Sequence, residues 1–221
     1  MSCAPAHAVD HDDQLWLQAN TNVPLSDGLR VTLEQIARFS DRQNGLFQSE
    51  LGALLQYRVA EQVDLGVGYR RVGAHNGNTG ADEDRFRVQM VGTFGRIFTR
   101  FRIDARLNPR GDEVGFRVRP LIRYNRPLSG KGLTIFATHE SFLIPNSTSW
   151  GQQSGYERMR NTLGLAIPIG SQVSADLGYL NEYRLGRRGR TGQMGHAVSL
   201  QLTINLRKLR PFKRQDDEST H

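Results

Sequence analysis

A strict alternation of apolar and polar side chains, repeated along the chain, constrains the fold more than any other feature of this sequence. In the stretch "HAVSLQLTINL", residues 196–206, Leu200, Leu202 and Ile204 are apolar. The residues between them, such as Gln201, are polar. Because successive side chains of a β-strand point to opposite faces, a period of two predicts a strand with one apolar and one polar face.

The same alternation recurs in about eleven segments, and no stretch has the 3.6-residue period of an amphipathic helix. The short connections "AEQ", "GR" and "GSQ" alternate with long ones rich in Gly, Asn and Ser, such as "GAHNGNTGADE" and "PNSTSWGQQSG". Tight turns at one end and long loops at the other are typical of outer-membrane barrels. The sequence therefore predicts an all-β fold, an antiparallel transmembrane β-barrel with short periplasmic turns and longer extracellular loops.

The expected number of strands follows from the chain length and from the even strand number of bacterial single-chain barrels. A chain of 221 residues suits about 10–12 strands, and we favour twelve. The first segment, around Leu15 and Leu17, is the one whose place in the barrel is open. Pro168 is expected near a strand end, whereas Pro120 lies inside a strand-like run although proline cannot donate to a ladder. A soluble β-sandwich that binds a ligand is the alternative fold.

The bulk composition agrees with a barrel. Mean hydropathy is −0.51, as expected where half of each strand faces a polar interior. The chain has no run of about 18 apolar residues, so no transmembrane helix is expected. The single cysteine, Cys3, excludes an internal disulfide.

The chain is expected to divide into three parts. The tripeptide "AHA" fits a signal-peptidase site, so residues 1–8 are interpreted as the remnant of a signal peptide, with an ordinary disordered terminus as the alternative. Residues 9–212 then form a single β-barrel domain. Residues 213–221 form a polar C-terminal tail.

Several longer stretches carry a family resemblance. They include "QLWLQANTNVPLSDGLRVTLEQIARFSD", "VDLGVGYRRV", "FRVRPLIRYNRPL", "HESF", "YERMRNTLGLAI" and "VSADLGYLNEY". Over roughly residues 14–206 the chain resembles the DUF2490 family of predicted outer-membrane β-barrel proteins of unknown function. The resemblance implies a place in the bacterial outer membrane, contact with its lipid and lipopolysaccharide, and a final aromatic residue read by the barrel-insertion machinery. Phe212 is the candidate for that residue, and an ordinary aromatic at a strand edge is the alternative.

The basic residues are almost all arginine and are spread over the predicted strands. Of 29 basic residues three are lysines, so 26 are arginines, and the net charge is +7. Binding of nucleic acid is not expected, because the basic residues of such proteins usually gather in a patch or tail. The loop stretch "GRRGR", residues 186–190, is a basic tip that could contact lipopolysaccharide, with a solvated loop as the alternative.

The polar phase of the predicted strands carries fifteen arginines but only seven acids. Arginine presents a planar fork that suits carboxylate, phosphate or sulfate. The surplus has two interpretations: a packed ion network that fills and stiffens a small barrel, or a narrow pore that passes small anionic solutes. The predicted lumen residues are Arg85, Arg87, Arg100, Arg102, Arg106, Arg117, Arg119, Arg123, Arg158 and Arg160.

His139 and Ser141, in the stretch "THESF", are two residues apart and therefore share one face of a strand. The alternation with Ile135 and Ala137 turns that face outward. A histidine beside a serine can activate the hydroxyl for attack on an ester. The pair resembles the His-x-Ser pair on the outer wall of lipolytic outer-membrane barrels, which have Asn after the serine where this chain has Phe142.

Such a histidine also needs a third group to orient it. The next segment offers Glu157 or Asn161, and the alternation favours neither. No metal or cofactor is expected, because the six histidines are scattered and no two have ligand spacing on one strand. The sequence therefore favours a porin-like or structural outer-membrane protein without enzymatic activity. The alternative is a phospholipase or lipid A deacylase that uses His139 and Ser141.

Overall fold

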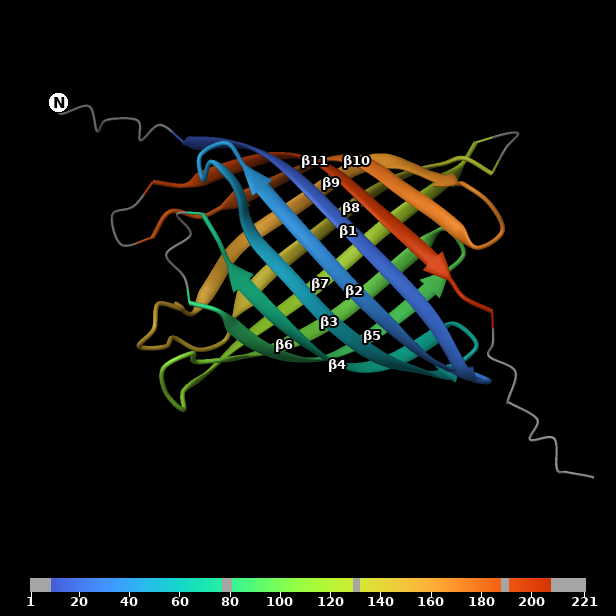
Figure 1. Ribbon diagram of the computed structural model, residues 1–221, viewed down its shortest axis with the longest axis horizontal. Helices are drawn as coiled ribbons and strands as arrows, with labels where there is room; N and C mark the ends of the chain where they lie inside the picture. Colours follow the sequence, from blue (N-terminus) through green and yellow to red (C-terminus); the bar gives the residue numbers. More distant parts are fainter. Residues whose placement is uncertain (1–8, 77–80, 129–131, 188–190, 208–221) are drawn as a thin grey trace, which may run out of the picture.

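The computed structural model describes residues 9–76, 81–128, 132–187 and 191–207 (Figure 1). These residues form eleven β-strands and no helix, so no helix within them is long and apolar enough to cross a membrane. The strands are β1 (Asp10–Ser26), β2 (Leu29–Ser40), β3 (Gly45–Ala60), β4 (Val63–Ala74), β5 (Glu83–Phe94), β6 (Ile97–Leu107), β7 (Val114–Pro127), β8 (Thr134–Ile144), β9 (Gly155–Pro168), β10 (Val173–Arg184) and β11 (Gln193–Asn205).

Three sequence-based expectations concern parts of the chain outside the described residues. They are the signal remnant 1–8, the terminal aromatic Phe212 and the polar tail 213–221. Of the basic loop 186–190, only the first two residues are described.

The strands close into a barrel in chain order, each antiparallel to the next, and β1 pairs with β11 in parallel. The parallel register runs from Asp10 opposite Gln193 to Asn22 opposite Asn205. The eleven strands lie within the expected range but are one fewer than the favoured twelve. Because the direction of the chain reverses at each step, the first and last of an odd number of strands run in the same direction. They can therefore close the barrel only as a parallel pair. The segment whose place was open is β1, which is part of the wall.

The two ends of the barrel differ in their connections (Figure 1). At one end, here called the turn end, the connections 27–28, 61–62 and 95–96 are tight. At the other, the loop end, the connections 75–82 and 145–154 are long. Connections are thus generally shorter at the turn end, as the sequence predicts, although 41–44 at the loop end is shorter than 128–133 at the turn end. The chain enters β1 at the loop end and leaves β11 at the turn end.

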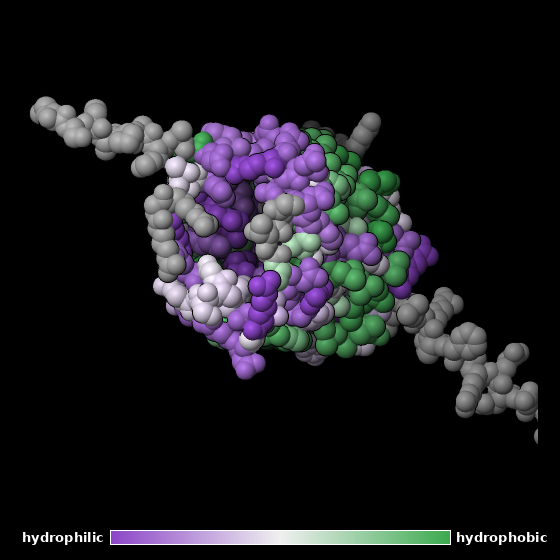
Figure 2. All heavy atoms as spheres, turned by 60° about the vertical axis from the view of Figure 1, so that its left-hand side comes forward, coloured by the Kyte–Doolittle hydropathy of each residue, from purple (hydrophilic) through white to green (hydrophobic). Residues whose placement is uncertain are grey.

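The outer wall is apolar and the interior is charged, as the alternation predicts. Figure 2 shows a hydrophilic, hollowed loop end beside a side wall that is largely hydrophobic. The charged side chains Glu34, Glu50, Asp104 and Glu140 are buried inside. A large contiguous exposed apolar surface is rare on soluble monomers. The exposed apolar residues of this outer wall include Leu33, Leu51, Leu55, Val67, Phe86, Val88, Met90, Phe101, Ile122, Leu163, Tyr179 and Val198.

The two awkward prolines are accommodated in different ways. Pro168 is the last residue of β9, as expected. Pro120 lies inside β7 and faces Phe101 of β6. On the side of β8, Val118 pairs with Leu143 and the next pair is Leu121 with Glu140. Pro120 therefore has no cross-strand partner in β8. The proline is therefore tolerated where the ladder between β7 and β8 is interrupted.

Three large aromatic side chains, Trp16, Phe136 and Phe142, are buried inside the barrel among the arginines. The guanidinium of Arg38 lies 4.1 Å from the centre of the Trp16 ring, and that of Arg123 lies 3.8 Å from the Phe136 ring. Cation–π contacts of this kind are worth more where water is excluded. The sequence-based expectations for the interior named charged residues and did not include these aromatic residues.

Candidate functional site

His139 and Ser141 lie on the outward face of β8, between the exposed apolar residues Ile135 and Leu143. The Nε2 atom of His139 is 3.0 Å from the Oγ atom of Ser141. The pair predicted from the sequence is therefore close enough to hydrogen-bond, and it is reachable from outside the barrel.

Asn161 of β9 supplies the third group. It is the direct cross-strand partner of His139, and its Oδ1 atom is 2.7 Å from His139 Nδ1. An amide oxygen can only accept, so Nδ1 carries the proton and Nε2 is left to accept the hydroxyl proton of Ser141. Glu157 instead lies inside the barrel, in ion pairs with Arg158 and Arg117. Between the two candidates from the sequence, the structure selects Asn161.

The backbone around Ser141 is irregular on both sides. Towards β9 the register shifts between Phe142 and Leu143. Towards β7 the ladder is interrupted opposite Ser141, at Pro120. Bulges and interruptions of this kind leave backbone groups unpaired and re-aim side chains, often beside active sites. The Tyr156 hydroxyl, next to the bulge, lies 3.1 Å from Ser141 Oγ.

The triad, defined here as Ser141, His139 and Asn161, lies near the loop end of the wall. Ser141 is followed in β8 by only three residues, the last being Ile144. The cross-strand register also aligns Asn161 with Asn181, so a polar row continues onto β10 at this level. The triad thus lies near the loop end of the wall, where polar and exposed apolar residues adjoin.

A second serine–histidine contact occurs elsewhere on the outer wall. Ser49 Oγ of β3 is 2.7 Å from Nε2 of His75. Among the residues that the structure describes, no third side chain is hydrogen-bonded to His75. This pair therefore has a serine–histidine contact like that of the triad but no side chain that orients the histidine. It serves as a matched control for the triad.

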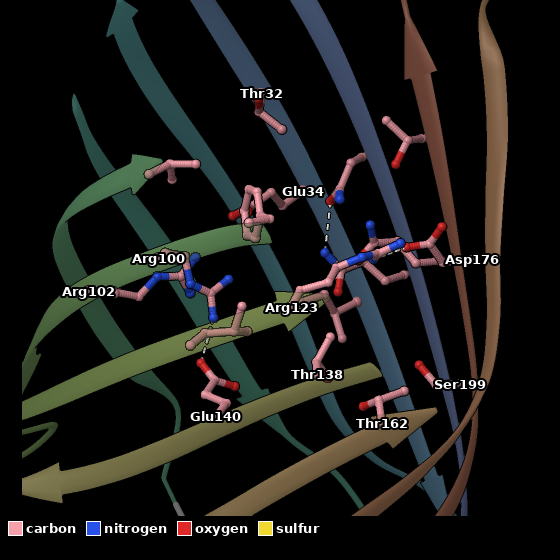
Figure 3. A pocket seen from close by; sticks show the side chains of 18 of the residues that line it. Thr32, Glu34, Arg100, Arg102, Arg123, Thr138, Glu140, Thr162, Asp176 and Ser199 are labelled. Carbon is pink, nitrogen blue, oxygen red and sulfur yellow. Dashed lines mark hydrogen bonds and ion pairs between the residues drawn. The ribbon is translucent and has the colours of Figure 1, made fainter. Parts of the chain in front are cut away.

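Inside the barrel, all ten arginines predicted for the lumen face inward. Nine of them line two cavities. The remaining one, Arg87, is buried in an ion pair with Glu34. A cavity of about 610 Å³ lies towards the turn end (Figure 3). A second cavity of about 930 Å³ lies towards the loop end.

Charged side chains near the middle of the barrel are joined in ion pairs. On one side of the barrel, Arg70 Nη2 lies 2.8 Å from Glu34, and Nη1 of the same residue pairs with Glu50. On the other side, Arg119 Nη2 lies 2.9 Å from Glu140, which a further arginine, Arg160, also contacts. We call this set the ion-pair belt; its described members are Glu34, Glu50, Arg70, Arg87, Asp104, Arg119, Glu140, Arg160 and Glu182.

The described residues contain no group of three or more His, Cys, Asp or Glu side chains that could hold a metal ion. The histidines of the outer wall are used otherwise. His139 contacts serine and asparagine, and His196 stacks on His11 with 5.3 Å between the ring centres.

Comparisons with known proteins identify relatives without an assigned activity. A family model described as "Protein of unknown function (DUF2490)" matches residues 13–193. An uncharacterized protein of Methylorubrum extorquens is 30% identical over 209 residues, which cover 87% of each chain. No solved structure shows a significant match.

Proposed function

The chain belongs to the DUF2490 family, described as proteins of unknown function, and from this premise we propose that it is an outer-membrane β-barrel that hydrolyses acyl esters of lipids. The observation that carries the proposed activity is the hydrogen-bonded triad of Ser141, His139 and Asn161 on the outward face of the wall. Ser141 is the nucleophile, His139 the general base and Asn161 the residue that orients it.

The proposed membrane location is supported by the distribution of side chains. The closed ladder leaves no unpaired strand edge, a requirement for strands in hydrocarbon. Apolar residues face outward and charged residues inward, as in outer-membrane barrels. By the usual arrangement of such barrels, the turn end is periplasmic and the long loops are extracellular.

The proposed reaction is acyl transfer through a serine ester. Ser141 Oγ attacks the ester carbonyl carbon while its proton passes to Nε2 of His139. The tetrahedral adduct collapses, the bond to the alcohol breaks, and His139 returns the proton to the leaving alkoxide. A water molecule, deprotonated by the same nitrogen, then cleaves the acyl-serine and releases a fatty acid.

Two features beside Ser141 suit stabilisation of the developing oxyanion. The Tyr156 hydroxyl lies 3.1 Å from Ser141 Oγ and can donate to an oxygen bound there. The irregular backbone between β7, β8 and β9 is the second feature, because unpaired amides in such regions can turn towards a ligand. Loss of one oxyanion donor typically lowers kcat about 10²- to 10³-fold.

The position of the triad favours a lipid as the substrate. An ester group of a membrane lipid lies at the boundary between hydrocarbon and headgroup. The triad lies near the loop end of the wall, beside the polar pair of Asn161 and Asn181. Phospholipids and the acyl chains of lipid A both present esters at this depth in the outer leaflet.

The test is fatty-acid release by protein refolded in detergent and inserted into vesicles of phosphatidylethanolamine and phosphatidylglycerol, with lipopolysaccharide supplied in a parallel assay. Release is expected from one of the two substrates. Release should disappear in Ser141→Ala and His139→Ala. Both variants should still migrate differently on an SDS gel before and after boiling, as folded barrels do. Ser49→Ala, which removes the other serine–histidine contact, should keep the wild-type rate. Absence of release from both substrates, or equal rates in wild type and Ser141→Ala, would overturn the proposed activity.

The porin-like role expected from the sequence has less geometric support than the hydrolase. The ion-pair belt occupies the middle of the interior, where Glu34, Asp104 and Glu140 are all buried. We therefore assign the belt a structural role, that of fixing the barrel wall from inside.

A further inference from the structure

Unlike the buried arginines of the ion-pair belt, Arg102 forms no ion pair with an acidic side chain among the described residues. Its residue is 5% exposed, and it lines the turn-end cavity. Within the described part of the chain it donates two hydrogen bonds to the amide oxygen of Gln89, from Nε at 3.0 Å and from Nη2 at 2.8 Å. Among the described residues, no carboxylate forms an ion pair with it.

The acids around Arg102 are already committed to its neighbours. Arg119, directly opposite on β7, bonds both Asp104 and Glu140. Arg100, two residues away on the same face, also bonds Glu140, while its Nε is buried and has no hydrogen-bond partner among the described residues. The cluster around Arg102 therefore contains more guanidinium groups than carboxylates to neutralise them.

A buried charge that lacks a partner is strongly unfavourable, and proteins resolve this with a counter-ion or a bound ligand. Here a cavity of about 610 Å³ adjoins the unpaired groups. Figure 3 shows Arg100 and Arg102 together on one wall of this cavity, with Thr138, Thr162 and Ser199 on another. The cavity thus has fork-shaped cationic donors on one side and hydroxyls on another. Three carboxylates also line it, and each is held in an ion pair with an arginine: Glu34, Glu140 and Asp176.

We propose that the turn-end cavity binds a small oxyanion, a carboxylate or phosphate group, between Arg102 and Arg100. A guanidinium can donate two parallel hydrogen bonds to such a group. The hydroxyls of Thr138, Thr162 and Ser199 would contact polar groups on the rest of the ligand. This volume is in the range of small-molecule sites, so the ligand class is a small hydroxylated organic anion. The site is separate from the outer-wall triad.

The test uses the refolded full chain in detergent, with inorganic phosphate, acetate and chloride compared at equal ionic strength. A ligand that binds only the folded state raises the unfolding midpoint with concentration. We expect phosphate or acetate to raise the midpoint progressively with the logarithm of its concentration, and chloride not to do so. Calorimetric titration should give a matching affinity, and Ser141→Ala protein should bind equally well.

Two substitutions make the assignment specific. Arg102→Met removes the unpaired charge at similar volume, so the midpoint without anion should rise and the response to phosphate should vanish. Arg119→Met is the matched control: Arg119 is similarly buried, at 8%, but pairs with Asp104 and Glu140, so its loss should lower the midpoint. Should Arg102→Met fail to fold, Arg102→Lys keeps the charge without the fork and should bind phosphate at least about tenfold more weakly.

Two results would contradict the inference. One is an equal rise of the midpoint in all three salts, which would mean general screening. The other is an unchanged response to phosphate in Arg102→Met or Arg102→Lys, which would place the bound anion elsewhere. Loss of hydrolysis in the vesicle assay bears on the triad alone and leaves this result unaffected.

Discussion

At the scale of single residues, the role of Asn161 can be tested separately from the nucleophile. Asn161→Leu removes the acceptor that holds His139 by Nδ1, so the ring loses its fixed tautomer and orientation. We expect kcat for ester hydrolysis to fall about 10²-fold or more, with KM little changed, whereas Asn161→Asp should retain more activity. Asn181→Leu, in the same polar row but bonded to Met194, is the control and should keep its rate. An unchanged kcat in Asn161→Leu would exclude the orienting role.

The backbone of one glycine, Gly164, lies close to a phenyl ring inside the barrel. Gly164 of β9 lies against Phe136, and a Cβ atom there would be 2.7 Å from the phenyl Cζ. Gly164→Ala is therefore expected to destabilise the barrel by about 1–3 kcal/mol through overpacking, measured from denaturant unfolding in detergent. Gly170→Ala, where no atom lies within 4 Å of the added carbon, should leave the unfolding midpoint unchanged.

At the scale of strands, the sequence predicted the elements and their faces better than their pairing. Period-two alternation identifies the outward face of β8 because successive side chains of a strand point to opposite faces of the sheet. It therefore placed His139 and Ser141 outward correctly. Alternation says nothing of which residue lies opposite on the next strand, so it could not choose Asn161 over Glu157. That choice needs the register, which pairs His139 with Asn161.

The closure of the barrel is testable by cross-linking. Asn22 of β1 and Asn205 of β11 are paired in the parallel register, with 2.8 Å between their amide atoms. In a Cys3→Ser background, Asn22→Cys combined with Asn205→Cys should form a disulfide on mild oxidation, because paired positions meet the distance requirement. Asp10→Cys with Asn205→Cys should not, since Asp10 pairs with Gln193 at the other end. Cross-linking of the second pair only would contradict the parallel closure.

At the scale of the whole molecule, the interior illustrates what composition can and cannot predict. The excess of arginine over acid on the polar phase predicted a positively charged interior, and the ten arginines do face inward. Whether they line an open pore or pair across the barrel depends on contacts between distant strands. Arg87 of β5 with Glu34 of β2 is one such contact. Sequence alternation carries no information on these pairings.

The ion-pair belt leads to a prediction about conductance. Because buried, hydrogen-bonded side chains occupy the middle of the interior, the protein in planar bilayers is expected to show no steady ion current. Conductance is measured in a salt gradient, with a known porin as the positive control for insertion. A stable, anion-selective current that diminishes in a variant carrying Arg117→Ser and Arg119→Ser would instead support the porin-like role.

The proposed activity requires an activated serine on the outer wall of a membrane barrel. The most direct measurement is covalent labelling of the refolded protein with a fluorophosphonate, located by peptide mass spectrometry, because such reagents modify activated serines whatever the natural ester is. We expect an adduct on Ser141 in the wild type and none in His139→Ala with the barrel intact. No adduct is expected on Ser49, because among the described residues His75 has no second hydrogen-bonded side chain to orient it. An unlabelled Ser141, or labelling that persists in His139→Ala, would contradict the proposed activity.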